Sequence, residues 1–320
     1  MLYTITGGAG FIGSNIAEEI VRRGKRVRIL DNFSTGKREN LSFPGSERIE
    51  VIEGDVQGLA DCRKAAEGAD FILHHAALVS VSRSVADPIL CHDINVTGTL
   101  NMLVAARDAG AKRFVFASSA AVYGNRDSGS ALPESVRLEP MSPYGSSKLI
   151  GEINCALFRE LYGLETVALR YFNVYGKRQN PHSDYAAVIP KFIQALLEGK
   201  RPTVYGDGLQ SRDFICVSDV VNANIKACEA DGRAAGLAFN IACNRSHSLL
   251  DLLREISAIT KKNGNPLFTD PQPGDIRFSM ADISLAREFL GFNPETSFHS
   301  GLEQTVEWYR GKIEIEKLRR

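Results

Sequence analysis

The sequence predicts an α/β protein with a doubly wound parallel sheet and a smaller C-terminal lobe. Short apolar runs recur along the first part of the chain, and helical patterns separate most of them. Beyond residue 176, loops rich in proline, glycine and charged residues interrupt this pattern, as is typical of a separate unit. A chain of 320 residues is long enough for two such lobes.

The first element joins a strand to a helix through a glycine-rich turn. An apolar run over 2–6 is followed by Gly7, Gly10 and Gly13, and then by a helical pattern. Gly7 can adopt backbone angles closed to other residues, Gly10 lets a pyrophosphate approach the main chain, and Gly13 lets the helix pack closely. This turn predicts a dinucleotide site at the positive end of the helix.

The second strand supports this interpretation. The run over 26–30 leads directly into Asp31, about 20 residues beyond the glycines, which is the usual spacing of a ribose-binding carboxylate. A carboxylate there can accept hydrogen bonds from an adenosine ribose and would repel a 2′-phosphate. The cofactor expected is therefore NAD rather than NADP, bound to a Rossmann-type sheet.

Further strands are expected at four runs, and functional side chains should follow them, because ligands bind at the carboxyl ends of parallel strands. Asp55 and Val56 follow the first of these runs and are placed to contact the adenine, although a simple turn aspartate explains Asp55 equally well. The four runs are 49–53, 70–74, 112–117 and 165–170.

The 70–74 run leads into the sequence His74-His75-Ala76-Ala77. Adjacent side chains at a strand end point to opposite sides, and no third ligand is near in sequence, so packing or backbone roles are expected rather than a metal site. The two alanines are small enough for a cofactor to lie against the main chain.

Two long helical patterns, 87–109 and 143–162, have apolar faces wider than the sheet needs, which predicts a homodimer built through a four-helix bundle. The run over 238–242 again has the pattern of a buried strand. We therefore expect an NAD-binding domain over 1–175 with return segments at about 214–260 and a substrate-binding lobe. That lobe is expected to comprise 176–213 and 261–320.

Ser119, Tyr144 and Lys148 are the residues expected to carry the chemistry. Tyr144 and Lys148 are four residues apart at the start of a helix, which places their side chains about 5–6 Å apart on one face. A lysine cation and a positively charged nicotinamide would lower the pKa of the tyrosine and make it a usable base. Ser119 ends the preceding strand and would hydrogen-bond the reacting hydroxyl. Surface packing explains most Tyr-xxx-Lys pairs. Here the pair follows a predicted dinucleotide-binding half of the chain, and this position favours a catalytic role.

Together these motifs resemble the extended short-chain dehydrogenase/reductases that act on nucleotide sugars, over nearly the whole chain. The resemblance includes TGGAGFIG over 6–13, His75-Ala-Ala77, and RYFNVYG over 170–176. Within that family, it is greatest to the NAD-dependent UDP-hexose 4-epimerases, particularly those that handle N-acetylated sugars. The segments that indicate this group are 80–84, 185–190, 206–208, 211–214 and 274–277.

The resemblance implies a site for each ligand. Asn173 and Arg212 would hold the diphosphate, although an ion pair with Asp213 is the competing interpretation of Arg212. Val188 and Tyr205 would flank the uridine. The cofactor residues implied are Gly7, Gly10, Phe11, Ile12, Gly13, Asp31, Asn32, Ser34, Gly36, Asp55, Val56, Ala76, Ala77, Asn95, Ser118, Tyr144, Lys148, Tyr171 and Phe172, and the substrate residues are Ser80, Arg83, Ser119, Asn173, Val188, Tyr205, Arg212, Arg277 and Ser279.

The residues after Ser119 indicate the reaction class. Related 4,6-dehydratases carry an Asp-Glu pair there, because elimination needs a second acid and base, whereas this chain has Ala120-Ala121. Only oxidation and reduction at C4 then remain, which would invert C4 through a transient 4-keto sugar without net consumption of NAD. A redox-consuming dehydrogenase or reductase of the same family and a non-catalytic NAD-dependent sensor are the alternatives.

Two further positions bear on the substrate. Gln272 stands where the family usually has an arginine on the phosphates, and Arg277 is the residue available to compensate. The resemblance implies that Ser279 falls at the position that faces the C2 substituent in related epimerases, although a polar residue near a lobe boundary is the competing interpretation. Its small size then predicts that UDP-GlcNAc and UDP-GalNAc are accepted along with UDP-Glc and UDP-Gal.

Composition excludes other classes of function. Lys plus Arg equals Asp plus Glu at 38 each, so no global field attracts nucleic acid or a membrane surface. The six cysteines lack metal-ligand spacing, and no run of about 18 apolar residues occurs, the minimum for a membrane span. A cytoplasmic enzyme without a metal site is expected.

Overall fold

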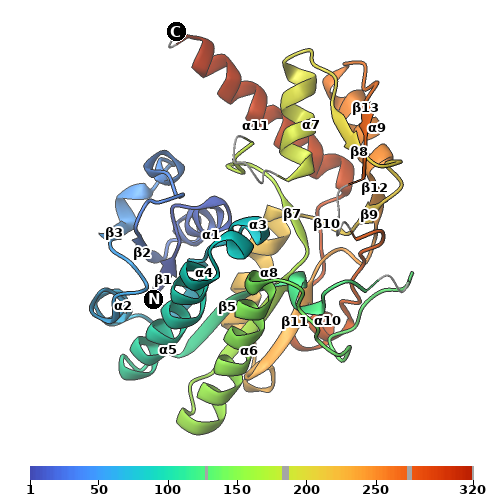
Figure 1. Cartoon of the computed structure of the whole chain (residues 1–320). Helices are drawn as coiled ribbons and strands as arrows, with labels where there is room; N and C mark the ends of the chain where they lie inside the picture. Colours follow the sequence, from blue (N-terminus) through green and yellow to red (C-terminus); the bar gives the residue numbers. More distant parts are fainter. Residues whose placement is uncertain (127–128, 182–186, 272–275, 319–320) are drawn as a thin grey trace.

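The computed structural model describes residues 1–126, 129–181, 187–271 and 276–318, so Tyr185 and Gln272 lie outside the described residues. Within them, a parallel sheet of seven strands has the order β11-β6-β5-β4-β1-β2-β3 (Figure 1). The order reverses between β1 and β4, which is where a doubly wound sheet binds its ligands. The strands are β1 (Leu2–Thr6), β2 (Arg26–Asp31), β3 (Ile49–Glu53), β4 (Phe71–His74), β5 (Arg113–Ser119), β6 (Thr166–Tyr171) and β11 (Leu237–Ile241), which confirms the predicted runs to within two residues at each end.

Helices cover both faces of this sheet, because the central strands bury alternate side chains in two separate cores. Val115 of β5 packs in the core beneath the first group of helices, whereas its neighbours Phe114 and Phe116 pack in the core beneath the second. The first group comprises α1 (Phe11–Arg22), α8 (Val217–Glu229) and α10 (Ser284–Leu290), and the second comprises α2 (Leu59–Ala66), α5 (Gly98–Asp108) and α6 (Pro143–Tyr162).

The predicted helix over 87–109 is present with a distortion. It consists of α4 (Pro88–His92), a π-helical turn over Asp93–Thr97, and α5, which follow one another without a break. A short helix, α3 (Val81–Ala86), precedes them. Single π-helical turns re-aim the side chains around them and are frequent at functional sites. No described helix is long and apolar enough to cross a membrane.

A third core lies under the second lobe. It packs α7 (Val188–Leu197), α9 (Leu249–Thr260) and α11 (Phe298–Leu318) against Val204 of β8. In Figure 1, these helices stand above the carboxyl edge of the large sheet. The small strands of this region are β7 (Asn173–Tyr175), β8 (Thr203–Tyr205), β9 (Ser211–Arg212), β10 (Phe214–Cys216), β12 (His247–Ser248) and β13 (Leu267–Thr269). Elsewhere in the chain, single 3-10 turns occur over Arg38–Leu41, Ser46–Arg48, Ala120–Tyr123 and Gly232–Ala234.

The division of the chain into two domains stays a prediction, and packing favours different limits for it. The return segment was expected to end near 260, but α9 packs with α7 and α11, because Leu252 and Ile256 lie in the third core. Conversely, α10 lies within 261–320 and buries Ala286 and Leu290 against the large sheet. The chain therefore crosses between the lobes more often than its composition indicates.

Candidate active site

A cavity of about 1170 Å³ extends along the carboxyl edge of the large sheet into the second lobe. It begins at the glycine-rich turn, passes the ends of β2, β4, β5 and β6, and reaches α7 and β8. Among the predicted site residues, its walls include Gly7, Gly10, Phe11, Ile12, Gly13, Asp31, Asn32, Ser34, Gly36, Asp55, Val56, Ala76, Ala77, Arg83, Ser118, Ser119, Tyr144, Lys148, Tyr171, Phe172, Asn173, Val188, Tyr205 and Arg212.

The glycine-rich turn has the shape that a bound pyrophosphate needs. Gly7 has a φ of +64°, and a Cβ there would lie 2.7 Å from the backbone nitrogen of Ala76. A Cβ on Gly13 would lie 2.5 Å from the carbonyl oxygen of Gly7, so the helix can approach the strand only with glycine. No side chain caps α1 and its first residues line the cavity, so the N–H groups of its first turn are available to an anion. These residues fit a dinucleotide phosphate.

Asp31 is held in place for a ribose. Asp31 as a residue is 7% exposed, and its carboxylate accepts hydrogen bonds from the backbone nitrogens of Ala9 at 2.9 Å and Phe33 at 2.8 Å. Burial raises the pKa of Asp31, and these two hydrogen bonds act in the opposite direction. A Cβ on Gly36 would lie 2.9 Å from the carboxylate, so a larger residue at this position would displace Asp31.

The Asp55 side chain stabilises the turn that it begins. Asn32 donates to its Oδ2 at 2.7 Å, and the backbone nitrogen of Gln57 donates to its Oδ1 at 2.9 Å. Burial raises the pKa of Asp55, but the hydrogen bonds from Gln57 and Asn32 outweigh it and lower the pKa. Asp55 is therefore a turn residue that also lines the cavity, and its contact with the adenine stays a prediction.

The start of α6 places Tyr144 and Lys148 against the end of β5. Ser142 caps the helix by accepting from the backbone nitrogen of Gly145 at 3.1 Å. The Nζ atom of Lys148 donates to the carbonyl oxygen of Ala117 at 2.8 Å and lies 5.9 Å from the centroid of the Tyr144 ring. Tyr144 and Lys148 therefore share one face, as their spacing predicts.

The pKa of Tyr144 differs from the sequence expectation. Burial raises it above 10.0, and the neighbouring Ser119 side chain acts in the opposite direction. Burial also lowers the pKa of Lys148 to about 8, against the opposing effect of the nearby Glu152 carboxylate. The expected decrease for Tyr144 assumed two nearby cations, whereas in the protein alone desolvation of the phenol is the larger effect.

A smaller cavity of about 230 Å³ opens beside Ser119. Its walls include Ala120, Ala121, Asn173 and Ser279, and the backbone nitrogen of Ser279 donates to the carbonyl oxygen of Ser211 at 3.2 Å. Ser279 is distant from Ser119 in sequence but lines the same cavity. That it faces the C2 substituent of a sugar stays a prediction.

Three predicted residues do not line either cavity. Asn95 is 2% exposed and uses its amide to bind Leu78 and the hydroxyl of Ser147 at 2.9 Å, so it orients the loop after β4 from behind. Ser80 caps α3 by accepting from the backbone nitrogen of Arg83. Arg277 pairs with Asp207 at 3.2 Å on the surface. Each has a polar partner within the protein, and the binding role expected of each stays a prediction.

Several polar wall residues were missed by the sequence interpretation. His75 lies in the main cavity with Nε2 3.0 Å from the hydroxyl of Tyr171, which donates to Asn224 at 3.0 Å. Burial lowers the pKa of His75 to about 4. In the second lobe, Lys191, Lys200, Arg201 and Gln179 also line the cavity. The adjacent cations at 200–201, next to a predicted loop, were the available signal for this group.

His74 packs inside the fold, whereas His75 lies in the cavity wall. His74 is 1% exposed, and its ring nitrogens contact the hydroxyls of Thr6 at 2.8 Å and Thr99 at 3.0 Å. Among the described residues, no group of three or more His, Cys, Asp or Glu side chains is arranged to hold a metal ion.

Comparison with known proteins places this site in a family. The model of the NAD dependent epimerase/dehydratase family matches residues 3–242. A UDP-glucose 4-epimerase of Mycolicibacterium smegmatis is 37% identical over 96% of this chain and 98% of its own length, and a UDP-N-acetyl-alpha-D-glucosaminuronate decarboxylase of Bacillus cytotoxicus is 34% identical over 96% and 97%. The solved structure of a UDP-N-acetylglucosamine 4-epimerase from Methanobrevibacter ruminantium M1, in complex with UDP-N-acetylmuramic acid, has a TM-score of 0.92 and 41% identity over 97% of this chain and 98% of that one. The glycine-rich turn and the side chains of Ser119, Tyr144 and Lys148 agree with this similarity. Because the similarity extends over nearly the whole length, the chain belongs to the NAD dependent epimerase/dehydratase family.

Proposed function

We propose that the protein is an NAD-dependent epimerase that inverts C4 of a UDP-hexose through a transient 4-keto sugar. One observation carries the proposal: among the described residues that line the two cavities, the carboxylates are Asp31 and Asp55, and both lie at the dinucleotide end. The sugar end has hydroxyl, phenol and ammonium groups but no described carboxylate. Proton transfer at one hydroxyl is the acid-base chemistry that this arrangement supports.

The roles of the residues follow from their positions. NAD, when bound, supplies the acceptor and donor of hydride for C4. Tyr144 accepts the proton of the sugar 4-OH and later returns it, while Ser119 holds that hydroxyl by a hydrogen bond. The Lys148 ammonium stabilises the phenolate, and its hydrogen bond to Ala117 fixes its position. Elimination and decarboxylation would each need a further acid or base at the sugar end.

We further propose that the second lobe binds the UDP group. Asn173 and Arg212 face both cavities and are placed for the diphosphate, whereas Val188 and Tyr205 line the far end of the main cavity and are placed for the uridine. The small cavity beside Ser119 would receive the hexose. With Ser279 in its wall, it has room for an N-acetyl group at C2.

We also propose a homodimer built through α5 and α6. Apolar side chains remain exposed along these helices, at 42% for Leu100, 50% for Ile153, 47% for Leu157 and 65% for Leu161. A row of exposed apolar residues on a pair of long helices is typical of a four-helix bundle between subunits.

All six cysteines lie within the described residues and are free thiols, which fits the proposed cytoplasmic location.

The proposed activity is tested by product and redox balance together. The purified protein is incubated with UDP-glucose or UDP-GlcNAc, and the sugars are resolved chromatographically while absorbance at the NADH band is followed. Interconversion of each C4 pair without net NADH supports the proposal. Steady accumulation or consumption of NADH would instead support a dehydrogenase or reductase, and an inert protein that retains NAD would support a sensor.

The breadth of the sugar site is tested with Ser279→Tyr. The larger side chain should exclude the N-acetyl group while leaving room for a hydroxyl at C2, so UDP-GlcNAc turnover should be lost and UDP-glucose turnover kept. Parallel rates on the two substrates measure the effect, with Ser284→Tyr as a control at an exposed position of α10 that lines neither cavity. Equal loss of both activities, or of neither, would show that Ser279 does not select the sugar.

A further inference from the structure

A short segment after β7 links the cofactor helix to the substrate side of the main cavity. This segment, Lys177–Gln179, is called the strap below. Gln179 lines the cavity, as do Asn173 and Val174 of the preceding strand. The strap is anchored on its other side by α1, whose first turn forms part of the glycine-rich dinucleotide site.

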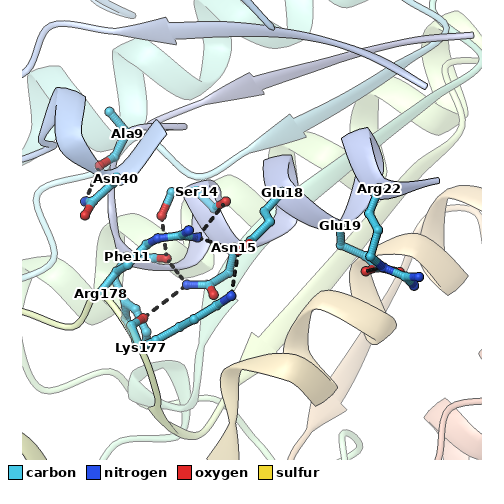
Figure 2. A network of polar contacts seen from close by, with 10 residues as sticks. All are labelled: Ala9, Phe11, Ser14, Asn15, Glu18, Glu19, Arg22, Asn40, Lys177 and Arg178. Atoms are coloured by element: carbon cyan, nitrogen blue, oxygen red, sulfur yellow. Dashed lines mark hydrogen bonds and ion pairs between the residues drawn. The ribbon is translucent and has the colours of Figure 1, made fainter. Parts of the chain in front are cut away.

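Glu18 of α1 binds two consecutive strap residues (Figure 2). Its Oε2 atom lies 2.6 Å from Nζ of Lys177 and 2.9 Å from Nη1 of Arg178. The side chain of Arg178 is 10% exposed and that of Glu18 is 28% exposed, so solvent screens this group less than an ordinary surface pair. Burial would raise the pKa of Glu18, but Lys177 and Arg178 outweigh it and lower the pKa.

Backbone contacts reinforce this anchor. The amide of Asn15 donates to the carbonyl oxygen of Lys177 at 3.2 Å, and Nη1 of Arg178 also lies 3.3 Å from the carbonyl oxygen of Ser14. Arg178 has a φ of +70°, a left-handed conformation that a residue with a side chain rarely adopts. Such a conformation persists only where the surroundings hold it, and here the contacts with α1 hold it.

The strap connects these contacts with α1 to the cavity wall. The side-chain amide of Gln179 donates to the carbonyl oxygen of Val174 at 3.2 Å, which fixes the strap against β7. The hydroxyl of Tyr309, from α11 of the second lobe, donates to the carbonyl oxygen of Gln179. One turn of chain therefore contacts α1 on one side and α11 on the other, with Gln179 in the wall between them.

The geometry points to Glu18 as a positioning residue for the UDP-sugar site, which it controls by holding the strap to α1. This role rests on the proposed function, because it concerns the same cavity. Glu18 lines neither cavity, and it acts through Lys177 and Arg178 on Gln179 and β7. Removing its charge leaves two neighbouring cations without their carboxylate and releases the strained backbone at Arg178.

The test compares Glu18→Gln with the wild type, both as full-length, NAD-loaded protein. UDP is titrated calorimetrically, the NAD content is measured by absorbance, and kcat and KM are determined with the UDP-sugar. We expect UDP affinity to fall and KM to rise by about tenfold, the size expected for lost charge-assisted hydrogen bonds. The NAD content and kcat should stay within about twofold of the wild type, because the catalytic residues are untouched.

Glu19→Gln is the matched control. Glu19 is the next residue of α1 and also binds two arginines, Arg22 at 2.7 Å and Arg23 at 2.9 Å, but both belong to the same end of the chain and not to the strap. Figure 2 shows Glu19 and Arg22 farther along α1, away from Lys177. The Glu19→Gln variant should bind UDP as the wild type does.

Lys177→Gln provides a second variant that is expected to fold, because the lysine side chain is 41% exposed. It should weaken UDP binding in the same direction, and the Glu18→Gln/Lys177→Gln double variant should be less impaired than the sum of the two changes.

Three results would each overturn this role: wild-type UDP affinity in Glu18→Gln, an equal loss of UDP affinity in Glu19→Gln, or a parallel loss of NAD from Glu18→Gln. A wild-type protein that binds no UDP would overturn the proposed function and this role with it.

Discussion

Burial and spacing act in opposite directions on Tyr144. The four-residue spacing from Lys148 brings a cation to the same helix face, and this would favour the phenolate. The structure gives Lys148 a backbone oxygen as its hydrogen-bond partner, and burial raises the pKa of Tyr144. Without a bound cofactor, Tyr144 is therefore a neutral phenol. A second positive charge, such as that of a bound nicotinamide, is needed before it becomes a base near neutral pH.

The role of Tyr144 predicts a specific loss. Tyr144→Phe removes the proton acceptor and keeps the ring, so turnover of a UDP-sugar should fall by about 10²–10⁴ while NAD is retained. Rates and NAD content are measured on the same preparation. Turnover above about a tenth of the wild-type value would contradict a general-base role for this residue.

Lys148 predicts a dependence of stability on pH in the protein stripped of dinucleotide. Burial lowers its pKa from 10.5 to about 8, so between these values the unfolded chain binds a proton that the folded protein does not. The resulting cost is full below about pH 8 and is relieved as pH rises toward the unfolded value. Relative to Lys148→Met, the wild-type free energy of unfolding should rise by about 2 kcal/mol between pH 7 and 9.5.

Urea unfolding at the two pH values measures this difference. Comparison with Lys148→Met cancels the titration of other groups, because both proteins share them. A difference that stays flat or falls with rising pH would show that the folded pKa of Lys148 is not depressed.

At the scale of elements, helix ends position the site. Gly10 precedes α1 without capping it by a side chain, which leaves N–H groups free for an anion, whereas Ser142 caps α6 and fixes the turn that carries Tyr144. The same α6 presents Lys148 inward and Leu157 outward. A single helix can thus serve both the active site and a subunit interface.

The proposed interface predicts that a charge on α6 dissociates the dimer. Leu157→Arg places a cation at the centre of an apolar surface, so the protein should elute as a monomer at micromolar concentration. Leu209→Arg, at a residue 55% exposed in the second lobe, is the control and should leave the mass unchanged. Light scattering measures both, and a dimeric Leu157→Arg variant would place the interface elsewhere.

At the scale of the whole molecule, the main cavity lies between two hydrophobic cores. The main cavity is lined on one side by β1 to β6 and on the other by α7 and β8, which belong to different cores. A ligand that contacts both sides stabilises their relative placement as well as each lobe. Occupancy of the UDP site should therefore raise the thermal stability of the molecule as a unit.

Arg212 provides the test at this scale. At 100 times its dissociation constant, UDP should stabilise the wild type by about 2.7 kcal/mol. Arg212→Ala loses a charge-assisted contact to phosphate worth about 1.5–3 kcal/mol, so the same UDP concentration should give a much smaller rise in Tm. Arg233→Ala, at a surface ion pair with Asp231, is the control. If UDP raised the Tm of Arg212→Ala as much as that of the wild type, the phosphate site would lie away from β9.

The sequence by itself determined the elements and the local geometry of the site. Strand runs, the Gly7 to Gly13 turn and the Tyr144 and Lys148 pair depend on periodicity and short spacings, which neighbouring residues already specify. Tertiary structure alone decided which partner each long polar side chain takes. Asn95 turns to Leu78 and Arg277 pairs with Asp207, while Ser279 comes to lie beside Ser119. Hydrogen-bond and charge partners are chosen by contacts between segments far apart in the chain, and no local pattern records those contacts.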